Sequence, residues 1–130
     1  MVDYLSQATE RPWMSIYLRI LAFVFAYGAI VHFGNIAGFG EMPWLKTPLT
    51  WRIGDVFYGI IDTAAVIGLW QRQVWGIGLF LVGILSQFII YTVFIDYFAS
   101  TPEQRQTIYG LLVTEAILVL IFTTLLLLKN

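Results

Sequence analysis

The sequence has no cysteine and only one histidine, His32. Without thiols the chain cannot form a disulfide framework, an iron–sulfur cluster or a zinc site built on thiolates. One imidazole cannot supply both axial ligands of a bis-histidine haem. The net charge of −1, with no run of like charges, gives nucleic-acid binding no electrostatic support. No phosphate-binding loop or nucleophile motif is present, so we expect no catalytic residues and no metal site.

Charged residues are scarce as well, at 12% of the chain, while apolar residues make up 59%. Soluble domains carry about 25% charged residues. Too little polar surface is therefore available to cover a globule in water. A membrane-spanning helix needs about 20 apolar residues, so a chain of 130 residues has room for four spans. The sequence predicts an all-α integral membrane protein, an antiparallel four-helix bundle formed as a single domain over residues 1–130.

Polar and proline-containing segments divide the chain into these spans. Pro12 suits the first turn of a helix, and the segment 39–50 reads as a loop because it holds two prolines. The connection 71–73 is so short that its flanking spans must form an antiparallel hairpin. Thr50, and either Ser100 or Thr101, are the expected N-caps of the second and fourth helices. We expect spans at about 13–38, 50–70, 74–98 and 102–128.

The orientation rests on basic residues near the span ends. With Arg19 counted there, four lie on the side of the termini and three on the other side. They are Arg11, Arg19, Arg72 and Lys129 on the first side, and Lys46, Arg52 and Arg105 on the second. We expect both termini to be cytoplasmic, because the long loop and the acidic residues Glu41, Asp96 and Glu103 then face outward. No secretory signal peptide is apparent in residues 1–12.

Ionisable residues deep in a bilayer cost about 2.5 kcal/mol or more each, so each needs a partner or a function. Asp62, Gln87 and Glu115 lie near the middle of three different spans. Arg19 is the cation expected to reach Asp62 or Glu115, and the four residues form the predicted buried polar core. We expect a static ion pair or hydrogen bond, and an alternative is a proton relay through the two carboxyl groups.

A second polar group lies closer to the membrane surface. His32 and Asn35 are three residues apart near the end of the first span, as are Arg52 and Asp55 near the start of the second. Antiparallel spans bring both pairs to a similar depth. The group either fastens two helices together or, with Tyr58, lines a ligand-binding pocket in which His32 donates a proton or binds a quinone.

The segments YLRILAFVFAYGAIVHF and RIGDVFYGIIDTAAVIGLW, with the tight turn into VWGIGLF, resemble those of the DoxX-like group of small four-helix membrane proteins. Arg19, Asp62 and the Trp75–Gly76 turn match the general pattern of that group, whereas His32 and Glu115 are not carried over. The resemblance implies a four-helix bundle. Roles in the group include a quinone-reducing partner in sulfur oxidation, redox-stress complexes and assembly chaperones, and the missing cysteine argues against thiol-redox activity.

We therefore expect a non-catalytic accessory or assembly subunit of a membrane complex. Its partners would be the lipid bilayer and either another membrane protein or a second copy of the chain. No segment outside the expected spans is longer than about a dozen residues, which leaves little room for an extramembrane active site. One alternative is a quinone- or lipid-binding component of an oxidoreductase, with quinone or lipid as its only expected cofactor. Another is a small proton-linked carrier using Asp62 and Glu115.

Overall fold

The computed structural model describes residues 1–128 and consists of helices joined by short connections. The four long helices are α2 (Pro12–Ile36), α3 (Leu49–Trp70), α4 (Val74–Val93) and α5 (Pro102–Leu127). Each is long and apolar enough to cross a membrane. A short helix, α1 (Val2–Ala8), precedes them, and the 3₁₀ turns η1 (Trp44–Lys46) and η2 (Ile95–Tyr97) lie in the connections. The predicted all-α fold with four long apolar helices is confirmed.

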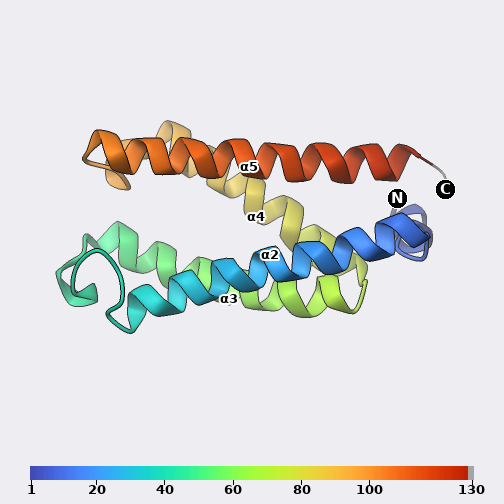
Figure 1. Ribbon diagram of the computed structural model, residues 1–130, viewed down its shortest axis with the longest axis horizontal. Coiled ribbons are helices and arrows are strands. Elements are labelled where there is room, and N and C mark those ends of the chain that lie inside the picture. The colour runs from blue at the N-terminus through green and yellow to red at the C-terminus, as the bar shows by residue number, and fades with distance from the viewer. Residues whose placement is uncertain (129–130) are drawn as a thin grey trace.

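The helices pack unequally (Figure 1). α2 and α3 lie side by side along most of their length, and α4 crosses obliquely between this pair and α5. α5 runs along the opposite side of the molecule and is the least buried. In its most apolar stretch 17% of the residues are buried, compared with 39% in α2 and in α3. α5 therefore presents a broad apolar surface.

Two helices end earlier than the sequence indicates. α2 ends at Ile36, because Gly38 adopts a left-handed conformation with φ of 99°. This turn lets the Phe39 amide donate to the Gly34 carbonyl at 2.9 Å, as is common where a glycine follows a helix. α4 ends at Val93 instead of continuing to residue 98, and the chain tightens into η2.

The capping predictions have different outcomes. Thr50 does not cap α3, which begins at Leu49 after Pro48. The Thr50 hydroxyl instead donates to the carbonyl of Tyr97 in η2 at 2.6 Å. Thr101 does cap α5. Its side chain accepts a hydrogen bond from the Gln104 amide at 3.1 Å, and the side-chain oxygen of Gln104 accepts one from the Thr101 amide at 3.3 Å. This reciprocal pair is a capping box.

The first residues contact the far end of the chain, which the sequence did not indicate. The Tyr4 hydroxyl and the Arg11 guanidinium both donate to the carbonyl oxygen of Leu126, at 3.0 and 2.9 Å. The last carbonyls of a helix have no partner within the helix. Tyr4 of α1 and Arg11, which precedes α2, thus bond one of the last carbonyls of α5.

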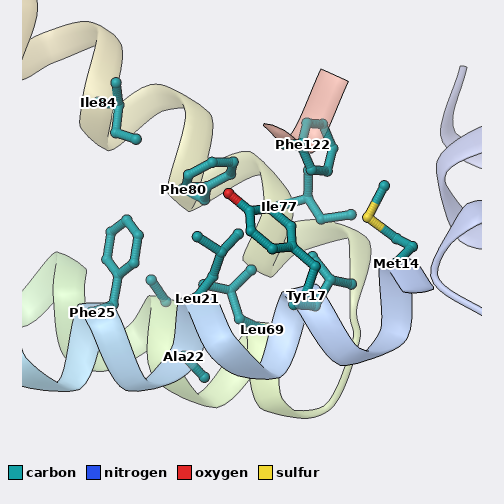
Figure 2. Packing of buried hydrophobic residues seen from close by; sticks show 12 residues of the cluster. Met14, Tyr17, Leu21, Ala22, Phe25, Leu69, Ile77, Phe80, Ile84 and Phe122 are labelled. Atoms are coloured by element: carbon teal, nitrogen blue, oxygen red, sulfur yellow. The ribbon is translucent and has the colours of Figure 1, made fainter. Parts of the chain in front are cut away.

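An apolar core fills the half of the bundle nearest the termini (Figure 2). Its central side chains include Leu21 of α2, Leu69 of α3 and Phe80 of α4, each almost wholly buried. Phe122 is the contribution of α5, and its ring meets that of Phe80 edge to face. The Tyr17 hydroxyl also reaches α5, donating to the carbonyl of Leu118 at 2.6 Å. These contacts attach the otherwise exposed α5 to the bundle.

Two glycines set the distance between α3 and α4. A Cβ atom added at Gly68 would lie 2.6 Å from the Cα of Gly76, and one added at Gly76 would overlap the backbone of α3 in turn. Small residues permit such close helix packing in membranes. The chain then turns between α3 and α4 within three residues. Arg72, in the middle of this turn, adopts a left-handed conformation with φ of 56°.

We predict that Gly76→Ala lowers the stability of the protein in detergent by about 1–3 kcal/mol, because the added methyl group has no space between the two backbones. The matched control is Gly78→Ala, at a site with no neighbouring atom within 4 Å. Alanine at an open helical site is better than glycine by about 1 kcal/mol. Thermal unfolding should therefore show a lower midpoint for the first variant only, and equal midpoints would contradict the close packing.

Candidate functional site in the bundle interior

Polar side chains from all four long helices meet in the half of the bundle beyond the apolar core. Asp55 and Asp62 of α3, Gln87 of α4 and Glu115 of α5 are each at least nine-tenths buried. His32 of α2 lies among them and is partly buried. Because these groups face the bundle interior, they avoid direct contact with acyl chains.

His32 joins α2 to α3 through Asp55. Its Nδ1 atom lies 2.9 Å from Oδ1 of Asp55, and the same oxygen accepts a hydrogen bond from the Asn35 side chain at 3.1 Å. Gly59 allows this approach, since a Cβ atom there would lie 3.3 Å from the Phe33 ring and 3.5 Å from the Cβ of His32. In the tautomer with the proton on Nδ1, that nitrogen donates a hydrogen bond to the Asp55 carboxylate, which leaves Nε2 of the neutral ring as an acceptor.

That second nitrogen faces another carboxyl group. His32 Nε2 lies 3.7 Å from Oδ2 of Asp62, so the imidazole is flanked by two carboxyl groups of α3. The Asp62 side chain occupies space left by Gly28, where an added Cβ atom would lie 2.6 Å from Oδ2. Asp62 is buried, with only 7% of its surface exposed, yet it receives no hydrogen bond within residues 1–128. Its carboxyl group is available to a ligand or a proton.

Tyr58 connects the histidine to α4. Its ring stacks on the His32 ring with centroids 6.1 Å apart and an interplanar angle of 28°. The Tyr58 hydroxyl lies 2.7 Å from the Ser86 hydroxyl, which donates to the carbonyl of Gly83 at 2.8 Å. Tyr58 thus contacts the imidazole with its ring and α4 with its hydroxyl.

Gln87 and Glu115 join α4 to α5. With the amide nitrogen of Gln87 oriented toward Glu115, it donates to Oε1 of the carboxylate at 2.7 Å. This neutral amide is the partner of Glu115, in place of the expected cation. The two residues thus provide a polar contact between α5 and the rest of the bundle.

Several of these groups line a partly open cavity of about 200 Å³ between the helices. All four long helices contribute to its walls, which are mainly apolar. The polar side chains in the walls are His32, Tyr58, Asp62, Gln87, Tyr91, Thr114 and Glu115. The two polar groups that the sequence placed at different depths therefore belong largely to one site. Among residues 1–128 no three acidic, histidine or cysteine side chains are grouped so as to hold a metal ion.

Arg19 does not belong to this buried polar core, so the predicted pair with Asp62 or Glu115 is wrong. Its side chain is exposed, and its guanidinium lies over the ring of Trp70, 5.0 Å from the ring centroid. Trp70 is eight residues from Asp62 in α3, which is about 12 Å of helix. The neighbouring buried residues of α2, Met14, Leu18, Leu21 and Ala22, share one side of the helix, and Arg19 lies on another. Its long side chain therefore leaves the core and reaches Trp70, the last residue of α3.

Arg52 is also absent from the cluster predicted around His32. The structure brings together His32, Asn35, Asp55 and Tyr58, but the Arg52 side chain has no ion pair or hydrogen bond within residues 1–128. Three residues of helix separate Arg52 from Asp55 by about 60° around the axis. That rotation is enough to place Asp55 inside the bundle and Arg52 on its outer surface.

Three polar residues of the site were not predicted: Ser86, Tyr91 and Thr114. Tyr91 follows Gln87 by four residues and therefore shares its helix face, a spacing that could have identified it. Thr114 and Ser86 directly precede Glu115 and Gln87. Their hydroxyls donate to backbone carbonyls within their own helices, so no sequence pattern distinguishes them from ordinary helix-bonded hydroxyls.

The fold and the cavity together define a helical multi-pass membrane protein with a polar interior site. Residues 12–130 match a family of unknown function, DUF6163, and the chain belongs to that family. No curated protein and no solved structure matches the chain.

We predict that His32 and Asp55 are energetically coupled, whereas Arg19 and Asp62 are not. A double-mutant cycle of His32→Gln with Asp55→Asn should give a coupling energy of about 0.5–3 kcal/mol in unfolding experiments, because the two side chains share a buried contact. The control cycle, Arg19→Met with Asp62→Asn, should be additive within about 0.5 kcal/mol. Additivity in the first cycle, or strong coupling in the second, would contradict the observed arrangement.

Proposed function

We propose that the protein binds, within the bilayer, the polar head group of an amphiphilic small molecule of the quinone or lipid class. The observation that carries this proposal is the cavity of about 200 Å³ with Asp62, His32 and Glu115 in its walls. Buried ionisable groups are costly in a membrane, and a static bundle could be built without them. Their convergence on one cavity supports a binding role.

The walls offer both kinds of hydrogen-bonding group. The Asp62 carboxyl and the free nitrogen of neutral His32 accept hydrogen bonds, and the hydroxyl of Tyr91 donates. A ligand hydroxyl, such as that of a quinol or a lipid glycerol, would be recognised by the acceptors. A quinone carbonyl would be recognised by the donor. Phe25 and Ile84 supply apolar walls beside these groups.

The size of the cavity favours a head group over an entire ligand. Pockets for drug-sized molecules have volumes of about 300–1,000 Å³, so a cavity of about 200 Å³ holds only part of such a molecule. An apolar tail would then pass between helices toward the lipid. The lightly buried α5, which contributes Leu111 and Leu118 to the walls, is the element beside which we expect the tail to leave.

We predict that the protein purified in mild detergent retains such a molecule. Organic extraction followed by ultraviolet absorbance and lipid mass spectrometry should detect it. Asp62→Asn combined with Glu115→Gln should reduce its retention by about tenfold. Both substitutions replace a carboxyl group that would hydrogen-bond the ligand by an amide with different donors and acceptors. Glu103→Gln is the matched control, since Glu103 is exposed at the start of α5. Extraction of no stoichiometric compound from the wild type would contradict the proposal.

A second candidate, proton transfer, is favoured by the position of His32 between Asp55 and Asp62. An imidazole between two carboxyl groups can accept a proton on one nitrogen and release one from the other. Four helices rarely enclose a pathway, so a carrier of this kind would have to oligomerise. This candidate is the proton-linked carrier expected from the sequence, with His32 added to Asp62 and Glu115.

We predict for this candidate that proteoliposomes containing the wild type dissipate a pH gradient faster than empty vesicles. Asp62→Asn with Glu115→Gln should abolish the difference, whereas Glu103→Gln should leave it intact. A pH-sensitive dye inside the vesicles measures the rate. Unchanged flux in the folded double variant would remove the proton-linked function.

The accessory or assembly role and the DoxX-like resemblance stay predictions. The exposed apolar surface of α5 is the face that a partner protein or a second copy would contact, and cross-linking in native membranes would capture either. The cytoplasmic location of both termini is part of the same proposal. The start of the chain and the end of α5 lie at one end of the bundle, as this arrangement requires.

A further inference from the structure

A second hollow lies outside the bundle, on the surface formed by η1 and the first half of α3. It has a volume of about 460 Å³ and is lined by seven residues. They are Trp44, Leu49, Arg52, Ile53, Val56, Phe57 and Ile60, which we call the Arg52 groove. The residues from α3 follow each other at alternating spacings of three and one, and so share one side of the helix. This side adjoins the one that carries Asp55 and Asp62, but it faces outward.

Two nitrogen atoms in the groove lack partners. The indole Nε1 of Trp44 and the guanidinium Nε of Arg52 are buried, and neither makes a hydrogen bond within residues 1–128. Arg52 also has no carboxylate partner there, in contrast to Arg105, which pairs with Asp96. A buried donor without an acceptor costs free energy. Both residues line the same groove, so an anionic group with several acceptor oxygens would meet both side chains there.

The rest of the groove is apolar and leads away from Arg52 along α3. Val56, Phe57 and Ile60 are between 42% and 60% exposed. Ile60 is eight residues beyond Arg52, or about 12 Å deeper along the helix. The groove thus has a cationic end near the start of a membrane-spanning helix and an apolar floor that extends toward the middle of that helix. Its charge and apolar distribution match those of a phospholipid with its head group at the membrane surface.

We propose that the Arg52 groove binds one anionic phospholipid, with its phosphate on Arg52 and Trp44 and an acyl chain along Val56, Phe57 and Ile60. The start of α3 adds the partial positive charge of a helix N-terminus beside the phosphate. Arginine suits this position because its planar group can donate two hydrogen bonds to one phosphate. The site is separate from the central cavity, and its occupancy does not depend on the function proposed for that cavity.

Native mass spectrometry of the full chain tests this proposal, with equal amounts of phosphatidylglycerol and phosphatidylcholine of the same acyl chains added in detergent. The wild type should retain one phosphatidylglycerol in preference to phosphatidylcholine. Arg52→Gln should reduce that retention by about tenfold. Trp44→Phe, which removes the indole N–H and keeps an aromatic ring, should reduce it by about threefold.

Lys46→Gln is the matched control, because Lys46 is exposed in the same connection and carries the same charge, but does not line the groove. It should change retention by less than about twofold. Arg52→Lys keeps the charge and should give an intermediate result, which preserves the test if Arg52→Gln unfolds. Circular dichroism verifies the fold of each variant.

Four outcomes would overturn the proposal. The first is equal retention of the two phospholipids by the wild type. The second is an equal loss in Lys46→Gln and Arg52→Gln, which would indicate general attraction to the charged end of the bundle. The third is a groove occupied by a second copy of the chain, seen as a lipid-free dimer that Arg52→Gln dissociates. Displacement of the lipid by glycerol phosphate at a similar concentration would likewise show that the acyl chain contributes nothing.

Discussion

The structure depends on one constraint: a charged or strongly polar side chain in a membrane-spanning helix must be kept away from the acyl chains. The contact of His32 with Asp55 meets this requirement between α2 and α3, at an N–O distance of 2.9 Å. The same constraint draws Gln87 and Glu115 together between α4 and α5. The bundle therefore has two differently built halves. Apolar packing fills the half near the termini, whereas the other half contains the buried polar groups and the cavity.

The division into two halves explains how the protein can hold a cavity without losing its fold. Phe25 and Ile84 belong to the apolar core and also line the cavity, so they mark the boundary between the halves. On one side of this boundary, close packing leaves little free space, and the glycines of α3 and α4 bring two backbones into contact. On the other side, α4 crosses obliquely between α5 and the pair of α2 and α3 (Figure 1). The cavity lies on that side, with walls from all four long helices.

Cations have a different distribution from the carboxyl groups in this protein. Arg19 lies over Trp70 instead of entering the core, and Arg52 lines an outer groove. Long basic side chains reach the membrane surface easily, whereas short aspartate side chains stay where the backbone places them. As a result the interior site holds carboxyl groups with a single imidazole, and the guanidinium groups remain available near the surface. The interior site and the Arg52 groove thus differ in charge and in the ligands we propose for them.

Composition and the spacing of apolar residues were sufficient to predict the four long helices, because the bilayer fixes the length and polarity of any helix that spans it. The proline and capping residues Pro12, Thr101 and Pro102 placed two helix starts closely, since caps act through local backbone bonds. The sequence also singled out His32, Asp55, Asp62, Gln87 and Glu115, because ionisable or amide groups stand out in apolar spans. Tertiary structure alone decided their partners. The rotation of each helix and the oblique course of α4 set which groups meet, and these depend on packing among all the helices at once, as at Gly28 beside Asp62 and Gly68 beside Gly76.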